Sequence, residues 1–201
     1  MTIDTVCSAS LVATQLAWMA LNVAECGTAC VCGSALCISR ESSAIIGAAG
    51  MLAGDGRCKT LDTTADGYVR AENVAVFGLC APGLGHRDAF AFIAGAAVNQ
   101  DGRSSSLSAP NGPSQTSVIG ASLARADLTA DSVSALGMHG TGTSLGDPIE
   151  VGGMSAILRT GVAGQRQGDR VVPLTLVASK SSSGHGEHVA GMVRLGFVKF
   201  L

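Results

Sequence analysis

One apolar segment, residues 11–24, sets the strongest limit on how this chain can fold. Its sequence, LVATQLAWMALNVA, consists of strong helix formers with apolar residues on nearly every face. A helix without a polar face is buried, so other elements are expected to cover it. Residues 1–3 read as the end of a strand, and Cys7 lies between that strand and the helix.

Cys7 is expected in the first turn of this helix, where unpaired backbone N–H groups and the positive end of the helix dipole stabilise an anion. A thiol at such a place loses its proton more easily and becomes a nucleophile near neutral pH. Free cysteines are also among the most often buried residue types, and most of them act as small apolar side chains. Cys7 alone therefore leaves two interpretations open, a nucleophile and a core residue.

The seven cysteines favour a reducing, cytoplasmic environment. Their number is odd and no signal peptide is recognised, so a secreted disulfide framework is not expected. Four of them lie within residues 26–37, but they lack the paired C-x-x-C spacing of structural zinc sites. No metal site is therefore predicted.

Neither a membrane nor a nucleic acid is expected as a partner. Residues 11–38 are the nearest approach to a membrane span, yet Gln15, Asn22 and Glu25 interrupt them, and an unpaired glutamate is costly in hydrocarbon. The net charge of −2 gives no electrostatic reason to propose nucleic acid or an anionic membrane surface. A buried helix followed by a buried strand explains the same residues.

The rest of the chain alternates between strand-like and helix-like segments. The expected strands are residues 28–38, 73–79, 89–98, 135–139 and 171–178. The expected helices are residues 115–126 after the cap Ser114, residues 148–158 after the cap Asp147, and residues 187–201. Residues 39–60 are expected to form a connecting region of loops. This alternation, in a chain with 27 glycines, predicts an α/β protein with a layered α/β/α architecture.

Three reactive side chains, Cys7, His139 and His185, each follow an expected strand. The carboxyl ends of strands are where open α/β sheets place their ligands. His139 and His185 are flanked by glycine and hydroxyl residues, which let a ligand approach the backbone closely. His86 and His188 do not lie in such turns and are expected to be structural.

Seven segments form a collinear set that runs from end to end of the chain. They are DTVCSAS around Cys7, DGRCK at 55–59, ADGYVRAE at 65–72, AVNQDGRS at 97–104, APNGPSQ at 109–115, HGTGTSLGDPIE at 139–150 and SKSSSGHGEHVAG at 179–191. In kind and order these segments resemble the β-ketoacyl synthase (ketosynthase) domains of type I polyketide synthases, which have the thiolase-like fold. One such segment is weak evidence, whereas seven in the same order are specific.

The resemblance implies a Cys-His-His site that catalyses a decarboxylative Claisen condensation. Cys7 would accept an acyl chain from a thioester and hold it covalently. A malonyl-type extender on an acyl carrier protein would then lose carbon dioxide, and imidazole N–H groups of His139 and His185 would stabilise the resulting enolate. The domain would bind no cofactor of its own, because the substrates arrive on the phosphopantetheine arm of the carrier protein.

The same resemblance implies roles for residues around these three. Lys180 would order the polar network around His185. Thr141 and Thr143 would bind the phosphopantetheine arm, for which small hydroxyl groups in a glycine turn are well suited. Asp147 and Glu150 are expected to be structural, since acidic residues in a first helical turn are common.

The resemblance further implies a partial domain, truncated at both ends. Residues 1–80 would correspond to the end of the amino-terminal half, and residues 81–201 to most of the carboxyl-terminal half. A late glycine- and phenylalanine-rich turn that offers a second oxyanion amide is then missing, which would leave the Cys7 amide alone. Losing one such donor costs roughly 10²- to 10³-fold in rate, so the isolated chain is expected to be a poor catalyst.

Two alternatives remain beside a condensing enzyme that forms a homodimer in its full-length context. One is a non-catalytic ketosynthase piece, kept for dimer contacts or for docking of the carrier protein. The other is a biosynthetic thiolase, which shares the fold and uses a second cysteine late in the chain. No cysteine follows Cys80, which speaks against the thiolase.

Overall fold

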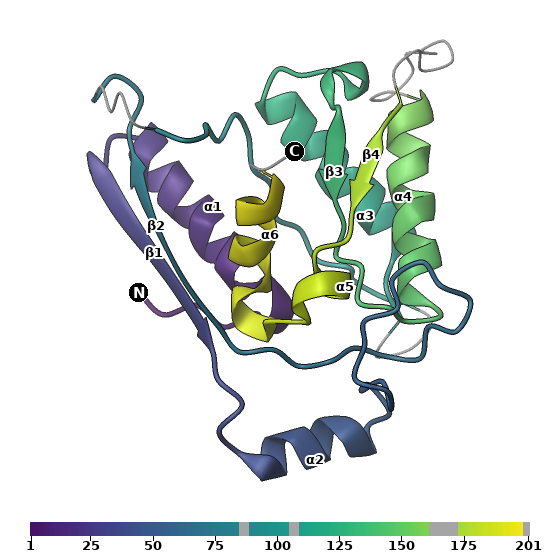
Figure 1. The fold of residues 1–201 in the computed structure, drawn as a ribbon. Coiled ribbons are helices and arrows are strands. Elements are labelled where there is room, and N and C mark those ends of the chain that lie inside the picture. The colour runs from purple at the N-terminus through teal and green to yellow at the C-terminus, as the bar shows by residue number, and fades with distance from the viewer. Residues whose placement is uncertain (85–88, 105–108, 161–172, 199–201) are drawn as a thin grey trace.

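The structure is a computed structural model, and it describes residues 1–84, 89–104, 109–160 and 173–198. Its elements form alternating layers of sheet and helix (Figure 1). A two-stranded sheet packs against α1 (Ala9–Asn22) and α6 (Ala190–Val198). A second two-stranded sheet packs against α3 (Gly112–Arg125) and α4 (Gly146–Thr160). The prediction of a layered α/β fold is confirmed.

The first sheet joins β1 (Thr28–Ala35) to β2 (Asn73–Cys80). The strands are antiparallel, and Thr28 lies opposite Cys80. Side chains alternate between the two faces of a strand, so one face of the pair is directed at the helices. The core on that face consists of Val31, Ala35, Val189 and Met192, with Ala75, Phe77 and Leu79 packed against it.

Helix α1 is only partly covered by these neighbours. It begins and ends two residues before the expected bounds, at Ala9 and Asn22. Its buried residues are Ala9, Ser10, Thr14 and Leu21, whereas Met19 is 45% exposed. The expected burial therefore holds for one side of the helix.

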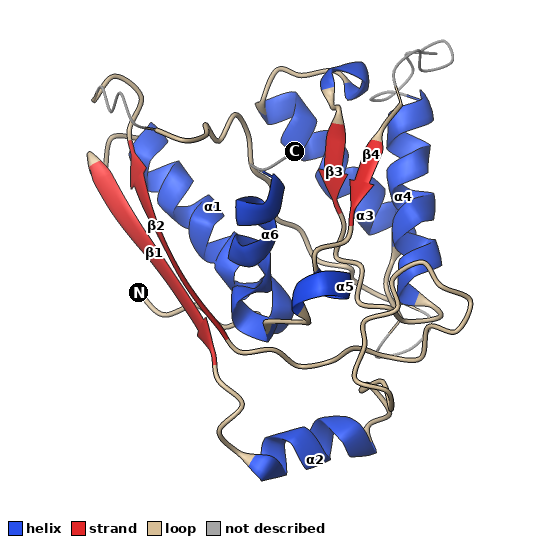
Figure 2. Cartoon of the chain, in the orientation of Figure 1, coloured by secondary structure: helices blue, strands red, loops and turns tan. Residues whose placement is uncertain are grey.

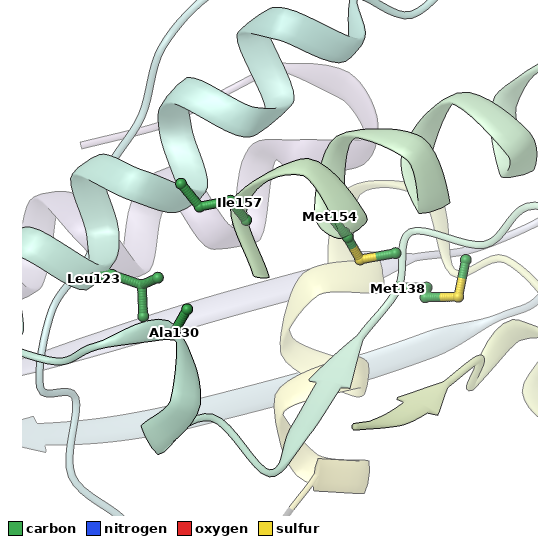
Figure 3. Packing of buried hydrophobic residues seen from close by; sticks show 5 residues of the cluster. All are labelled: Leu123, Ala130, Met138, Met154 and Ile157. Atoms are coloured by element: carbon green, nitrogen blue, oxygen red, sulfur yellow. The ribbon is translucent and has the colours of Figure 1, made fainter. Parts of the chain in front are cut away.

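The second sheet joins β3 (Ala135–Gly137) to β4 (Thr175–Val177) in parallel. Its core lies between these strands and the helices α3 and α4. Figure 3 shows the buried residues of this cluster, Leu123, Ala130, Met138, Met154 and Ile157. This packing fixes the end of β3, after which Met138 and His139 follow directly.

An unexpected helix, α2 (Arg40–Ala48), occupies part of the segment for which loops were expected. The Ser39 side chain caps it by accepting a hydrogen bond from the Ser42 N–H at 3.2 Å, and Glu41 lies in its first turn. Figure 2 shows the helix apart from the layers, joined to them by long loops, and Ile45 is 71% exposed. Local capping therefore explains this helix better than core packing does.

The prediction of a strand at residues 89–98 is wrong, and residues 1–3 are likewise not a strand. Within the described part of the chain, no strand pairs with residues 89–98. Side chains bond to their carbonyl groups instead. Trp18 Nε1 donates to the Ile93 oxygen at 3.0 Å, and Arg125 donates to the Ala96 oxygen at 2.6 Å. These bonds satisfy two carbonyl groups that a ladder would otherwise pair.

Both expected helix caps in the second half differ from those observed. Asn111 caps α3, since its side-chain oxygen accepts from the Ser114 N–H at 3.1 Å, so Ser114 is a donor inside the helix. Helix α4 starts at Gly146, which places Asp147 in the first turn and not at the N-cap. An amide oxygen at the N-cap serves the same purpose as the expected hydroxyl.

The remaining predictions differ mainly in their bounds. The expected strands at 28–38 and 135–139 end earlier, at Ala35 and Gly137. Of the expected strand at 171–178, residues 171–172 lie outside the described residues, and β4 covers the rest only in part. The closing helix is a short 3-10 turn, η3 (Glu187–Val189), followed by α6. Residues 199–201 and His86 also lie outside the described part.

Among the described residues, no helix combines the length and apolar character that crossing a lipid bilayer requires.

Candidate active site

Cys7 lies in a 3-10 turn, η1 (Val6–Ser8), immediately before α1. Its neighbour Val6 has a φ of 54°, which is a left-handed conformation that a β-branched residue rarely adopts. The Asp4 side chain holds this turn by accepting from the Val6 N–H at 3.1 Å. Strained backbone of this kind is concentrated at functional sites, where the surrounding structure maintains it.

The prediction that Cys7 loses its proton more easily than an ordinary thiol is wrong, because the net shift of its pKa is upward, although a backbone hydrogen bond at Cys7 does lower it. Burial raises the pKa of this thiol, and the opposing effect of the Lys180 charge is smaller. The negative charge of Glu187 raises it further. A half-buried sulfur one turn ahead of α1 loses more by desolvation than it gains from nearby positive charge.

His185 is the direct partner of Cys7. Its Nε2 atom lies 3.1 Å from the Cys7 Sγ, and its side chain is fully buried. Desolvation, followed by the positive charge of Lys180 and then of His188, lowers the pKa of His185 to about 3, so the ring is neutral at physiological pH. The Glu187 N–H donates to Nδ1 at 3.1 Å. A neutral ring that accepts at Nδ1 carries its proton on Nε2, so His185 directs an N–H at the sulfur.

The backbone of His185 is held by a loop from the middle of the chain. The His185 N–H donates to the Val69 carbonyl at 2.8 Å, and the Ala71 N–H donates to the His185 carbonyl at 3.0 Å. The Tyr68 ring meets the imidazole edge-on, with the ring centroids 4.8 Å apart. The segment ADGYVRAE therefore lies at the site.

His139 completes the cluster from the end of β3. Its ring centroid lies 5.6 Å from that of His185, and the two rings are nearly perpendicular, at 88°. The side chain remains accessible to solvent, yet it is surrounded by enough of the chain that desolvation lowers its pKa. Together with the charges of Lys180, His185 and Arg194, this brings the pKa to about 3. The second imidazole is thus also neutral at physiological pH.

Glu150 and Lys180 fix the backbone around His139. The Glu150 carboxylate accepts from the backbone N–H groups of His139 and Gly140, the latter at 2.9 Å. Lys180, at the start of α5 (Lys180–Ser183), is 4% exposed and donates from Nζ to the His139 carbonyl. Its hydrogen bond is thus to His139, whereas the sequence predicts a role beside His185. Desolvation, together with the Arg194 charge, lowers the pKa of Lys180 to about 8.

The glycine turn after His139 contains both threonines of interest. Gly140 and Gly142 have positive φ values of 50° and 77°, which turn the chain sharply between them. The hydroxyl oxygens of Thr141 and Thr143 lie 3.5 Å apart. Thr143 Oγ1 accepts from the Gly146 N–H at 3.1 Å, so its oxygen helps to start α4 while its O–H can still donate.

Asp147 ties the glycine turn to a neighbouring loop. It is 2% exposed, and its carboxylate accepts from the N–H groups of Leu61, at 2.9 Å, and Gly142, at 3.2 Å. The Glu150 carboxylate likewise accepts from backbone N–H groups. These contacts support the expectation that both acids are structural.

Cys58 and His188 lie near the site, although neither contacts Cys7 by a hydrogen bond among the described residues. Cys58 is buried beside the site and accepts a hydrogen bond from the Val69 N–H at 3.3 Å. His188 forms an exposed pair with Asp4 at 3.6 Å. It also borders a hollow of about 500 Å³ between α1 and β1, which none of Cys7, His139 and His185 lines. In the described part of the chain, no cluster of three potential metal ligands is present.

Sequence reasoning missed one strong contact at the site. Arg70 forms an ion pair with Glu187, with Nε and Oε1 2.8 Å apart, although the two residues are 117 positions apart. Both belong to segments that resemble the family, DGYVR and GHGE. The opposite charges of Arg70 and Glu187 were the only indication of an ion pair in the sequence. Neither segment by itself indicates that the two lie side by side in the fold.

Sequence families match nearly the whole chain. "Beta-ketoacyl synthase, N-terminal domain" matches residues 1–81, and "Beta-ketoacyl synthase, C-terminal domain" matches residues 90–200. Polyketide synthase GfsB of Streptomyces halstedii is 44% identical over 203 residues, which are 99% of this chain and 4% of that protein. Erythronolide synthase EryA2 of Saccharopolyspora erythraea is 42% identical over 195 residues, which are 95% of this chain and 5% of that protein.

Solved structures of ketosynthases have the same fold. The oxazolomycin ketosynthase domain OzmH KS7 of Streptomyces albus JA3453 aligns with a TM-score of 0.91 at 33% identity, over 100% of this chain and 34% of that one. The ketosynthase from module 6 of the bacillaene synthase of Bacillus subtilis 168 aligns with a TM-score of 0.88 at 34% identity, over 98% of this chain and 35% of that one. The chain thus spans about a third of these structures. It belongs to the β-ketoacyl synthase family, as part of a ketosynthase domain of the type I polyketide synthases, with the thiolase-like fold.

Proposed function

We propose that this chain carries the condensing site of a polyketide synthase, in which Cys7 holds the growing acyl chain and His139 and His185 stabilise an enolate. The observation that carries the proposal is the 3.1 Å contact between Cys7 Sγ and His185 Nε2, with the His139 ring beside it. Family membership supports the same reaction type, a decarboxylative Claisen condensation.

The first step is transfer of an acyl chain to Cys7. The sulfur attacks the carbonyl carbon of an acyl thioester, a new S–C bond forms, and the bond to the original sulfur breaks. That leaving sulfur takes up the proton that Cys7 loses. Because His185 directs an N–H at Sγ, the ring stabilises the thiolate rather than removing its proton at Nε2. A raised thiol pKa makes this stabilisation more important, since little thiolate forms without it.

The second step is decarboxylation and condensation. The bond to the carboxylate of a malonyl-type extender breaks, carbon dioxide leaves, and the electron pair forms an enolate. Neutral imidazoles are N–H donors, so the fully buried His185 and the solvent-accessible His139 are proposed to stabilise the enolate oxygen. The enolate carbon then bonds to the acyl carbon on Cys7, and the sulfur leaves and regains a proton.

The substrates of this reaction are thioesters on an acyl carrier protein. Their phosphopantetheine arm is proposed to lie along the glycine turn, where Thr141 and Thr143 offer hydroxyl groups. The chain itself needs no cofactor for this chemistry. A homodimer in the full-length protein and a cytoplasmic location complete the proposal.

The test is acylation of the chain by a soluble acyl thioester, followed by proteolysis and mass spectrometry of all seven cysteine peptides. The adduct is expected on Cys7 and is expected to disappear in Cys7→Ala. The buried Cys58 is the internal control, because it lies beside the site and its hydrogen bond is to the Val69 backbone. Acylation of another cysteine in preference to Cys7 would contradict the proposal.

A further inference from the structure

We infer that the ion pair between Arg70 and Glu187 is a positioning device, which keeps the proton of His185 on Nε2 and thereby controls the reactivity of Cys7. The inference deepens the proposed function and rests on it for the role of Cys7 as nucleophile. The pair is proposed to act on the sulfur through the imidazole. The charge of Glu187 also raises the pKa of Cys7 directly, so its removal in Glu187→Gln works against the expected loss of reactivity, whereas Arg70→Lys leaves that charge in place.

The pair has the geometry of a strong and specific contact. Arg70 Nε lies 2.8 Å from Glu187 Oε1, and Nη2 lies 3.0 Å from Oε2, so the guanidinium and carboxylate groups make a two-point contact. The side chains are 11% and 13% exposed, which limits competition from water. The third nitrogen, Nη1, donates to the hydroxyls of Ser42, at 3.0 Å, and Ser43, at 2.7 Å, on α2.

The backbone of Glu187 explains why such a contact is needed. Glu187 has a φ of 41°, in the left-handed region that a residue other than glycine seldom occupies without support. In this conformation its N–H lies 3.1 Å from His185 Nδ1 and donates to it. The side chain of Glu187 is held by Arg70 at the same time, so the ion pair stabilises the strained turn that supplies this donor.

The same loop holds both residues, which makes the arrangement rigid. Val69 and Ala71 bond to the backbone of His185, and Arg70, between them, bonds to the side chain of Glu187. The segment 69–71 therefore fixes the backbone of His185 directly, and through Arg70 it holds the side chain of Glu187, whose N–H donates to Nδ1. Without the donor at Nδ1, the proton can move to that nitrogen, and Nε2 then becomes an acceptor that no longer stabilises a thiolate.

The experiment compares Glu187→Gln, which removes the charge at nearly constant size, with Arg70→Lys, which keeps a cation but loses the two-point contact. The control is Asp55→Asn, which removes the contact of Lys59 with Asp55, 3.3 Å apart. Asp55 is 48% exposed and Lys59 17%, and Lys59 keeps its ion pair with Asp66 at 2.8 Å. Circular dichroism establishes that each variant folds.

The first measurement is the ¹⁵N NMR spectrum of the histidines, with the His185 signals assigned by their loss in His185→Phe. The wild-type chain is expected to show a protonated Nε2 and an unprotonated Nδ1, and both site variants are expected to show a mixture of tautomers. The second measurement is the alkylation rate of Cys7 by iodoacetamide as a function of pH. It is expected to fall in the site variants in step with the share of the Nδ1–H tautomer, up to roughly 10- to 100-fold for complete loss of the hydrogen bond to the thiolate.

Unchanged tautomers together with an unchanged alkylation rate in a folded Glu187→Gln or Arg70→Lys chain would overturn the inference. So would loss of folding in both variants, because the pair would then act on the whole fold. Rescue of the rate in Glu187→Asp relative to Glu187→Gln would support it. If acylation of Cys7 fails in the wild type while tautomer and alkylation respond as expected, the inference stands and the proposed function fails. If Cys7 is acylated in the wild type while tautomer and alkylation do not respond in the variants, the proposed function stands and the inference fails.

Discussion

The replacement of His185 by phenylalanine is predicted to raise the pKa of Cys7 and to slow its reaction with electrophiles. The ring fills a fully buried place, so phenylalanine keeps the cover over the sulfur while it removes the N–H at 3.1 Å. Alanine would open a cavity and hydrate the thiol, which would mask the effect. A hydrogen bond to a charged group contributes about 1.5–3 kcal/mol. At about 1.4 kcal/mol for each unit, the pKa of the thiol is expected to rise by about one to two units.

The assay is alkylation by iodoacetamide over a range of pH, with the Cys7 peptide quantified by mass spectrometry after digestion. In the variant, the midpoint of the rate profile is expected to move to higher pH, and the rate below it is expected to fall roughly 10- to 100-fold. The Cys26 peptide from the same digest is the reference for general changes in exposure, since Cys26 is half-buried outside the site. A midpoint that stays in place or moves to lower pH would refute the reasoning that His185 stabilises the thiolate.

Three further predictions concern stability. Gly142→Ala is expected to destabilise the chain by at least about 2 kcal/mol in urea unfolding, because φ is 77° and the new Cβ would lie 2.6 Å from the Lys59 nitrogen; a smaller loss would show that the turn can relax. Leu123→Ala is expected to cost about 2–4 kcal/mol, since Leu123 is 8% exposed in the second core, while alkylation of Cys7 in the folded chain stays unchanged. The folded pKa of His185, about 3, lies below its ordinary value, so the unfolded state binds the proton first as pH falls. The unfolding free energy is therefore expected to fall from about pH 6.5 downward, by about 2 kcal/mol at about pH 5, and more weakly in His185→Phe; equal slopes in the two chains would contradict the assignment.

Much of the site was predictable from the sequence because its chemistry is local. The glycine turn around Thr141, the strand before His139 and the helix after Cys7 each follow from short patterns that the structure repeats. The contact of His185 with Cys7, 178 positions apart, was predicted from the resemblance and from the place of each residue after a strand. The position of each residue after an expected strand and the order of the family segments both indicated that Cys7 and His185 share one site.

The wrong predictions have a common cause: each depends on contacts that segments distant in the sequence make in the fold. The helix dipole correctly favours a Cys7 anion, but the sign of the pKa shift depends on how much of the chain covers the sulfur. Residues 89–98 have the composition of a strand, yet α1 and α3 supply side-chain donors to their carbonyls instead of a ladder. The Arg70–Glu187 ion pair could not be predicted from either segment alone, because it forms only where the two segments meet in the fold.

The measurement that tests the central claim most directly is a ¹⁵N NMR titration of His139 and His185. The account requires two neutral imidazoles beside Cys7, because only neutral rings with a fixed N–H serve as donors to a thiolate and an enolate without carrying charge into the site. Both rings are predicted to stay neutral down to at least about pH 5, with the proton of His185 on Nε2. Titration of both rings near their ordinary value, about 6.5, or a proton on Nδ1 of His185 would contradict the account.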